Sequence, residues 1–191
     1  MNTRTAIRGH LARAIAVLAA GAAIAMPATA ANAAVAPISR CPSLGQQFAN
    51  PGFEAGNVAW TASDAVIAHN WQGEPSHSGD WLAWLDGFGT THTDTLTQTV
   101  PVLSSCTATL SFWLYVDTWE TSTTFALDTM TVAVNGVTKA TYSNLNDNDA
   151  WTYVSIVLTG VSDHATVTFT GTEDASWQTS FVIDDTGLTM S

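Results

Sequence analysis

The segment "LSFWLYV", residues 110–116, decides the fold because its apolar and polar positions alternate with a period of two. One face carries only apolar side chains: Leu110, Phe112, Leu114 and Val116. The other face carries Ser111, Trp113 and Tyr115. A period of two is typical of a β-strand with one buried face. We therefore expect a strand here whose first set of side chains faces a core.

The same alternation recurs in residues 130–134, 151–158 and 165–169, each with one apolar face. The opposite face carries Thr in 130–134 and 165–169, and Trp151, Tyr153 and Ser155 in 151–158. Helical periodicity is absent. Turn residues separate the runs at Asn50-Pro51-Gly52, Asp86-Gly87, Asn135-Gly136 and Thr159-Gly160. Several strands of this kind favour two sheets packed face to face. The sequence predicts an all-β protein, an antiparallel two-sheet sandwich of eight or nine strands.

The N-terminal residues 1–33 have the layout of a secretory signal peptide. Arg4, Arg8 and Arg13 precede an apolar run over residues 14–26, and small residues follow it. A retained amphipathic membrane anchor is the alternative interpretation. We expect export to the extracellular space, a short linker over residues 34–47 that contains Cys41, and a sandwich domain over residues 48–190. No later segment is apolar for long enough to span a membrane.

The charge balance after the leader is strongly acidic. Arg40 and Lys139 oppose all 16 Asp and Glu residues, so the net charge is 2 − 16 = −14 with neutral His. Such a surface repels nucleic acid and anionic lipid. Hydrophobic residues nevertheless make up 46% of the chain, and all eight Trp follow the leader, which indicates a packed domain and excludes disorder. We expect one core and a monomer.

The two cysteines, Cys41 and Cys106, fit an exported protein. In an oxidising compartment an even count predicts a disulfide. Closing a loop of this length would stabilise the fold by about 4 kcal/mol. Neither a CxxC motif nor a Cys and His cluster with zinc spacing is present, so we interpret the predicted bridge as structural.

Sequence signatures of known enzyme classes are missing. The chain lacks a GxSxG elbow, an HExxH motif, a P-loop and a Rossmann glycine pattern. "DGFG", residues 86–89, opens no helix and is interpreted as a turn. A small secreted hydrolase stays an alternative, because the spatial separation of paired carboxylates is not visible in a sequence.

Four motifs resemble a known family: "NPGFEAGNVAW" (50–60), "AWLDGFGTTHTDTLTQTV" (83–100), "CTATLSFWLYVDTWET" (106–121) and "FTGTEDASWQTSFVIDDTGL" (169–188). In this order they resemble the jelly-roll, galactose-binding-like accessory module of many secreted bacterial peptidases and other exported hydrolases. They are also similar in outline to carbohydrate-binding modules. The resemblance covers residues 48–190 and implies a jelly-roll fold. Because this sequence holds no catalytic domain, a separate secreted enzyme is a candidate partner.

The resemblance also implies a structural calcium shared by Glu54 and Asp184. Ca²⁺ prefers six to eight oxygen ligands, and no Lys or Arg lies near Asp184 and Asp185 in sequence. Asp184 is out of phase with Phe181 and Ile183, so it is expected to point away from the core. Asp185 shares their parity and is expected near the strand end, within reach of water or a backbone N–H. The alternative is that both carboxylates are only solvated.

A second acidic group, Asp117, Glu120 and Asp128, flanks a Thr-rich loop. His92 and Asp94 are two residues apart on one expected strand, so they share a face and can chelate a metal. The alternative is that these residues bind no metal and are polar side chains on loops beside an exposed Thr-rich face. The sequence leaves a second metal site near Glu120 and Asp128 open.

Four aromatic side chains fall on the solvent parity of their strands: Trp113, Tyr115, Trp151 and Tyr153. Exposed aromatic rings stack on the apolar faces of sugars, and neighbouring polar groups bind hydroxyls. The alternative is that the loops at 69–78 or 117–127 fold over these rings as a minor core. The sequence predicts a secreted, calcium-stabilised, non-catalytic module that binds a glycan or extracellular polymer. A protein-interaction module of exported peptidases is the rival function.

Overall fold

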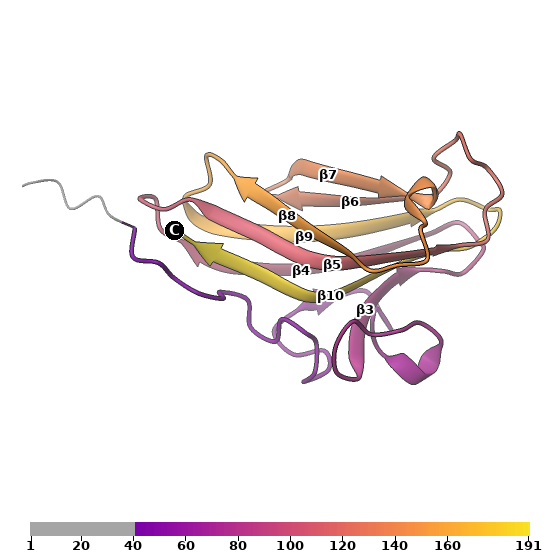
Figure 1. Ribbon diagram of the computed structural model, residues 1–191, viewed down its shortest axis with the longest axis horizontal. Coiled ribbons are helices and arrows are strands. Elements are labelled where there is room, and N and C mark those ends of the chain that lie inside the picture. Colours follow the sequence, from indigo (N-terminus) through magenta and orange to yellow (C-terminus); the bar gives the residue numbers. More distant parts are fainter. Residues whose placement is uncertain (1–40) are drawn as a thin grey trace, which may run out of the picture. The chain divides into compact units, whose positions relative to one another are not determined.

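A computed structural model describes residues 41–191, and the expected signal peptide lies outside the described residues. Two five-stranded sheets pack face to face (Figure 1). The first sheet has the order β2 (Ile67–His69), β3 (Trp81–Asp86), β10 (Thr179–Met190), β5 (Ala108–Thr118) and β8 (Thr152–Leu158). The second has the order β1 (Thr61–Ala62), β4 (His92–Val102), β9 (Asp163–Glu173), β6 (Thr129–Val134) and β7 (Val137–Ser143).

All neighbouring strands are antiparallel, which confirms the predicted all-β sandwich. Ten strands form where eight or nine were expected, because β1 and β2 have only two and three residues and no alternation long enough to recognise. Two short 3₁₀ helices complete the elements, η1 (Asn70–Gln72) and η2 (Asn144–Asn146). Neither of these helices is long and apolar enough to cross a membrane.

The core between the sheets consists of the predicted inward faces. Phe112 of β5 and Phe169 of β9 are fully buried, and their rings meet edge to face with centroids 5.1 Å apart. The four apolar residues of 110–116 are at most 3% exposed. The period-two pattern therefore placed the correct face of β5 in the core.

A second, smaller cluster covers the outer face of the first sheet. Ala68, Leu82 and Val182 are buried there, although all three lie on the side of the sheet that faces away from the main core. Residues 70–80, which connect β2 to β3, pack over this face. As a result β10 is buried on both of its faces along most of its length.

The N-terminal part of the described chain is fastened to the sandwich. The predicted disulfide between Cys41 and Cys106 is present, with the two Cα atoms 4.8 Å apart. Leu44 exchanges backbone hydrogen bonds with Met190, and the Gln47 N–H donates to the Leu188 carbonyl. The last residues of the expected linker therefore extend the sheet beside β10.

Candidate functional site

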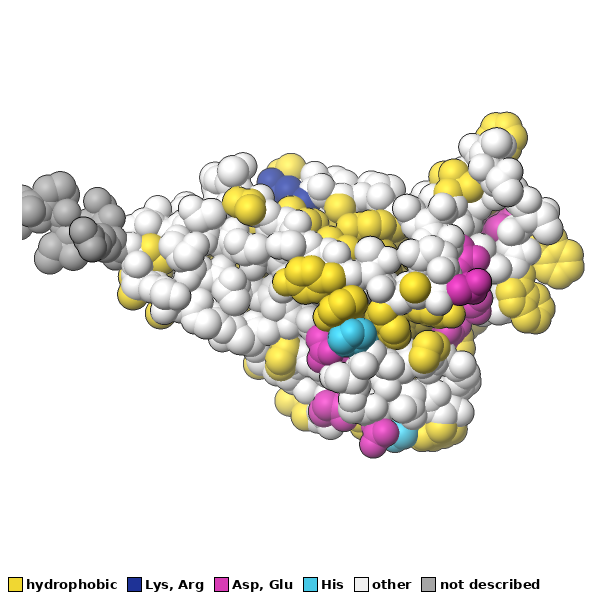
Figure 2. Space-filling view, viewed as in Figure 1, with side chains coloured by type: hydrophobic (Ala, Val, Ile, Leu, Met, Phe, Trp, Pro, Cys, Tyr) yellow, Lys and Arg dark blue, Asp and Glu magenta, His cyan; other side chains and the backbone are white. Residues whose placement is uncertain are grey.

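The four predicted aromatic residues gather on the outer face of β5 and β8. Trp113 lies opposite Tyr153 in the register of these two strands, and their ring centroids are 5.3 Å apart. The rings of Tyr115 and Trp151 form a second pair at 5.6 Å. Figure 2 shows hydrophobic side chains gathered on this face beside a His and several acidic side chains. The aromatic face, as we call these four residues, is thus one continuous cluster.

The loop at 70–80 covers part of the aromatic face. The His77 ring stacks on Trp113 with centroids 4.1 Å apart and meets Trp151 edge to face at 5.4 Å. Trp71, on the same loop, is exposed and does not cover the cluster. Tyr153 remains 56% exposed. Both alternatives from the sequence therefore hold in part. His77 covers Trp113, whereas Tyr153 stays open to solvent.

His77 is fixed by two adjacent carboxylates of β10, Asp184 and Asp185. Its Nδ1 atom lies 2.6 Å from Asp185 Oδ2, and the Ser78 hydroxyl donates to Asp185 Oδ1. The His77 and Ser78 N–H groups donate to Asp184 Oδ2 at 2.8 and 3.0 Å. Burial, opposed in part by these hydrogen bonds, raises the pKa of Asp184 to about 6.

Asp185 is partly exposed, as expected, but it does not share the side-chain parity of Phe181 and Ile183. A β-bulge interrupts the pairing of β10 with β5 between Asp184 and Gly187, and Asp185 has a left-handed backbone with φ of 44°. A bulge adds a residue and resets the alternation of side chains. Both carboxylates consequently contact residues 77 and 78 on the outer side of the sheet.

Glu54, the other predicted calcium ligand, contacts the far end of the same loop. Its Oε1 atom accepts the N–H groups of Asp80 and Trp81, both at 3.0 Å. Gly79 has φ of 61°, and a Cβ there would overlap the Glu54 carboxylate. Glu54 and Asp184 therefore clamp residues 77–81 from two sides. All four of their carboxylate oxygens accept at least one backbone N–H. Glu54 Oε2 and Asp184 Oδ1 accept only one each and retain a lone pair for a further ligand.

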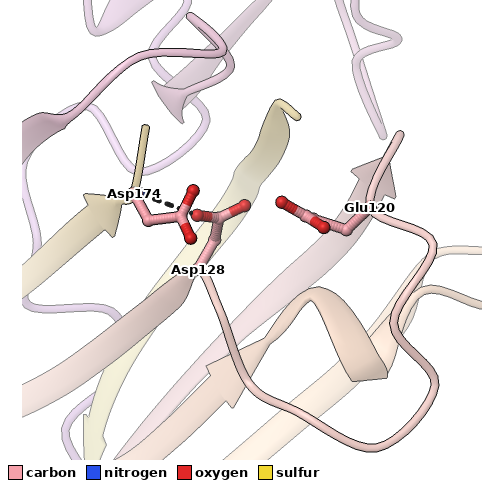
Figure 3. Close-up of side chains that lie close together, drawn as sticks. All are labelled: Glu120, Asp128 and Asp174. Atoms are coloured by element: carbon pink, nitrogen blue, oxygen red, sulfur yellow. Dashed lines mark hydrogen bonds between the residues drawn. The ribbon is translucent and has the colours of Figure 1, made fainter. Parts of the chain in front are cut away.

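A separate group of three carboxylates lies at one end of the sandwich (Figure 3). Glu120 follows β5, Asp128 precedes β6 and Asp174 follows β9, and one oxygen from each lies within 4.8 Å of the others. Asp128 is fully buried and accepts the Asp174 N–H at 2.8 Å. Burial and the other two carboxylates raise the pKa of Glu120. Oxygen donors in this arrangement can hold a metal ion.

The third member of this group differs from the one suggested by the sequence. Asp117 was grouped with Glu120 and Asp128, but Asp174 takes its place. Asp174 is distant in sequence, and only the pairing of β6 with β9 brings it to Asp128. The acidic stretch "GTED" at 171–174 was the available signal.

Asp117 instead belongs to an acidic rim around Tyr115. Burial, followed by Asp117 and Glu74, raises the pKa of the Tyr115 hydroxyl. Glu74, from the covering loop, is only 7% exposed. Burial raises the pKa of Glu74, a hydrogen bond with Ser180 lowers it in part, and Asp117 raises it further. Hydrogen-bond acceptors therefore adjoin the aromatic rings.

The raised pKa of Glu74 predicts a measurable pH effect. The folded protein binds this proton more tightly than the unfolded chain does, so Glu74 lowers stability progressively as the pH rises above its ordinary pKa of 4.5. We expect Glu74→Gln to melt at a higher temperature than the unmodified chain at pH 8, and at the same temperature at pH 4. Scanning calorimetry at both pH values measures the difference, with Asp80→Asn on the same loop as an exposed control. An equal difference at both pH values would contradict the effect.

Neither a protein-family model nor a curated protein matches this chain. Among solved structures, it is similar to the carbohydrate-binding module TmCBM61 in complex with β-1,4-galactotriose. The TM-score is 0.54, with 18% identity over 75% of this chain and 97% of that chain. It is also similar to the enzymatically active domain of tailspike protein 4 of bacteriophage CBA120. Here the TM-score is 0.51, with 12% identity over 76% of this chain and 21% of that chain.

The chain has the β-sandwich fold of a carbohydrate-binding module. The jelly-roll sandwich implied by the sequence resemblance is thereby confirmed. At these identities the likeness concerns the fold, and the roles of the aromatic face, Glu54 and Asp184 stay predictions.

Proposed function

We propose that this protein is a secreted, non-catalytic module that binds a neutral glycan on its aromatic face. The observation that carries the proposal is the exposed Tyr153 ring, which lies beside Trp113 on the outer face of the first sheet, while His77 links Trp113 to Trp151. Flat aromatic rings bind the apolar faces of sugars by stacking. The similarity in fold to a module that was solved with a galactose oligomer supports this choice of ligand class.

The charge of the surface favours a neutral glycan over an acidic one. Lys139, on β7 of the other sheet, is the one Lys or Arg among residues 41–191, and all 16 Asp and Glu lie in the same range. Asp117 and Glu74 beside Tyr115 can accept hydrogen bonds from sugar hydroxyls. The same carboxylates repel uronic acids, sulfated sugars and nucleic acids.

The test is the affinity of aromatic variants for soluble polysaccharides. For a neutral polymer such as β-1,4-galactan we expect Tyr153→Ala and Trp151→Ala each to weaken binding about tenfold or more, because each removes a stacking surface. Affinity electrophoresis measures the change. Trp177→Ala is the matched control, since Trp177 is also exposed but lies on the loop between β9 and β10. Unchanged affinity in both aromatic variants would overturn the proposal, as would preferential binding to polygalacturonate.

Calcium stabilisation and export belong to the same proposal. Glu54 and Asp184 are the ligands implied by the sequence resemblance, and they join segments near the two ends of the domain. The disulfide supports an oxidising, extracellular location. When bound, a calcium ion would supply positive charge to carboxylates that otherwise depend on backbone N–H groups. Glu120, Asp128 and Asp174 are a second place where an ion would be accommodated.

One observation favours the rival function of a protein-interaction module. The loop at 119–128 exposes two large apolar side chains, Trp119 and Phe125, which are 60% and 70% exposed. Such side chains are frequent contacts in protein interfaces. If the protein works by binding a secreted enzyme, a Trp119→Ala and Phe125→Ala double variant would lose that binding and keep its affinity for polysaccharide.

A further inference from the structure

Two aspartates lie buried where the two sheets meet at β3 and β4. Asp86 is 3% exposed and Asp94 is 2% exposed. By alternation with Leu82 and Trp84, Asp86 would lie on the outer face of β3, but its φ of 61° is left-handed. A Cβ at Gly171 of β9, in the opposite sheet, would overlap the Asp86 carboxylate. The unusual backbone thus turns this carboxylate inward, between the sheets.

Three oxygens of these two side chains have no hydrogen-bond donor. Within residues 41–191, the buried side-chain nitrogen and oxygen atoms that lack a partner are Asp86 Oδ1, Asp86 Oδ2 and Asp94 Oδ1. The remaining oxygen, Asp94 Oδ2, accepts the Asp86 N–H at 3.0 Å. Unsatisfied buried polar atoms are rare in folded proteins, and each one requires an explanation. Here all three occur in one place.

The neighbouring buried carboxylates are fully satisfied. Glu173 accepts the N–H groups of Phe88, Gly89 and Thr179. Asp128 accepts the Asp174 N–H and the Thr179 hydroxyl. The fold therefore supplies donors to every carboxylate oxygen of Glu173 and Asp128, but leaves both oxygens of Asp86 and one oxygen of Asp94 without a donor.

No cationic side chain among residues 41–191 forms a hydrogen bond with the unpaired oxygens of Asp86 and Asp94. His92 Nε2 lies 3.1 Å from Asp94 Oδ1, which is within ion-pair distance, but the two atoms lack hydrogen-bond geometry. Burial, followed by the charges of Asp94, Glu173 and Asp128, raises the pKa of Asp86 to about 8. Two adjacent buried carboxylates are strongly unfavourable unless a positive charge joins them.

Asp86 and Asp94 also line a pocket that reaches the surface, although their three unpaired oxygens are themselves buried. Its volume is about 160 Å³, and its lining includes Asp86, Asp94 and the exposed Asp64. One water molecule needs only about 10–15 Å³ of such space. The pocket can therefore admit an ion together with several of its water ligands.

We propose that Asp86 and Asp94 bind a divalent, oxygen-preferring cation of the calcium type through their three free carboxylate oxygens. Asp64 stands at the mouth of the pocket, and water completes the coordination. Calcium prefers carboxylate and water oxygens, whereas imidazole nitrogen suits zinc and copper, so His92 is not a ligand of this ion. The site is separate from Glu54 and Asp184 and from the cluster at Glu120, and it does not depend on glycan binding.

The test uses the whole chain and calcium alone. Calcium is titrated by calorimetry into metal-free protein and into Asp86→Asn, whose amide is isosteric and whose backbone tolerates a positive φ. We expect Asp86→Asn to bind one fewer Ca²⁺ per chain. In EDTA it should melt at the same or a higher temperature than the unmodified chain, because a buried charge has been removed. Asp94→Asn is the second variant and should lose the same ion.

Two controls make the outcome decisive. Asp174→Asn removes a carboxylate of the other cluster, and His92→Gln removes the adjacent imidazole, and both should keep the ion at Asp86. The proposal is overturned if Asp86→Asn and Asp94→Asn bind as many calcium ions as the unmodified chain. It is also overturned if the unmodified chain binds none, which would mean that Asp86 stays protonated instead.

Discussion

Replacing Cys41 and Cys106 together by serine is expected to lower the free energy of unfolding by about 4 kcal/mol. The disulfide links residues 65 positions apart, so its loss releases a long loop in the unfolded chain. For a domain of this size the melting temperature should fall by about 8–16 °C. Calorimetry on the oxidised protein and the double variant measures the change.

Ser105→Ala is the matched control, because Ser105 is exposed and adjoins Cys106. It should change stability by less than about 0.5 kcal/mol. A loss below about 1 kcal/mol in the double variant would contradict the expectation. It would show that the hydrogen bonds of Leu44 and Gln47 to β10 hold the N-terminal segment without the disulfide.

Asp184→Ala is expected to lower the free energy of unfolding by about 2 kcal/mol in EDTA. The substitution removes the acceptor of the His77 and Ser78 N–H groups, and hydrogen bonds to a charged acceptor are worth about 1.5–3 kcal/mol. Because the pKa of Asp184 is raised to about 6, its carboxylate is ionised at pH 8, and the loss should be measured there by urea denaturation.

The same variant tests calcium at Glu54 and Asp184. If Asp184 binds the ion, millimolar calcium will stabilise the unmodified chain more than the variant, and the difference between the two proteins will widen relative to EDTA. Equal differences in calcium and in EDTA would reject this site. Asp80→Ala, an exposed side chain on the same loop, should leave stability unchanged in both conditions.

The sandwich and the aromatic face were predictable because they depend on local alternation. A period of two assigns each side chain of residues 110–116 to a face, and the faces proved correct. The structure pairs β5 with β8 and places Trp113 opposite Tyr153, a register that alternation allows but does not fix. Alternation does not predict the path of the loops that connect strands. The stacking of His77, on the loop between β2 and β3, against Trp113 was therefore not predicted.

The predictions failed or stopped short where the backbone departs from regular strand geometry. The bulge at Asp184 turned Asp185 to the opposite side from the one expected. Asp86, which the sequence predicts to be part of a turn, has a left-handed backbone and a carboxylate buried between the sheets. Asp174 joins Glu120 and Asp128 through pairing between distant strands. The period-two alternation predicts none of these three features.

The attachment of residues 77–81 at both ends has a consequence for ligand binding. Asp184 and Asp185 fix His77 and Ser78, while Glu54 fixes Asp80 and Trp81. The wall beside Trp113 is therefore already ordered in the free protein, and a sugar that docks there would not have to freeze a mobile loop. Preorganisation of this kind reduces the conformational entropy lost on association, which would favour the glycan binding that we propose for the aromatic face.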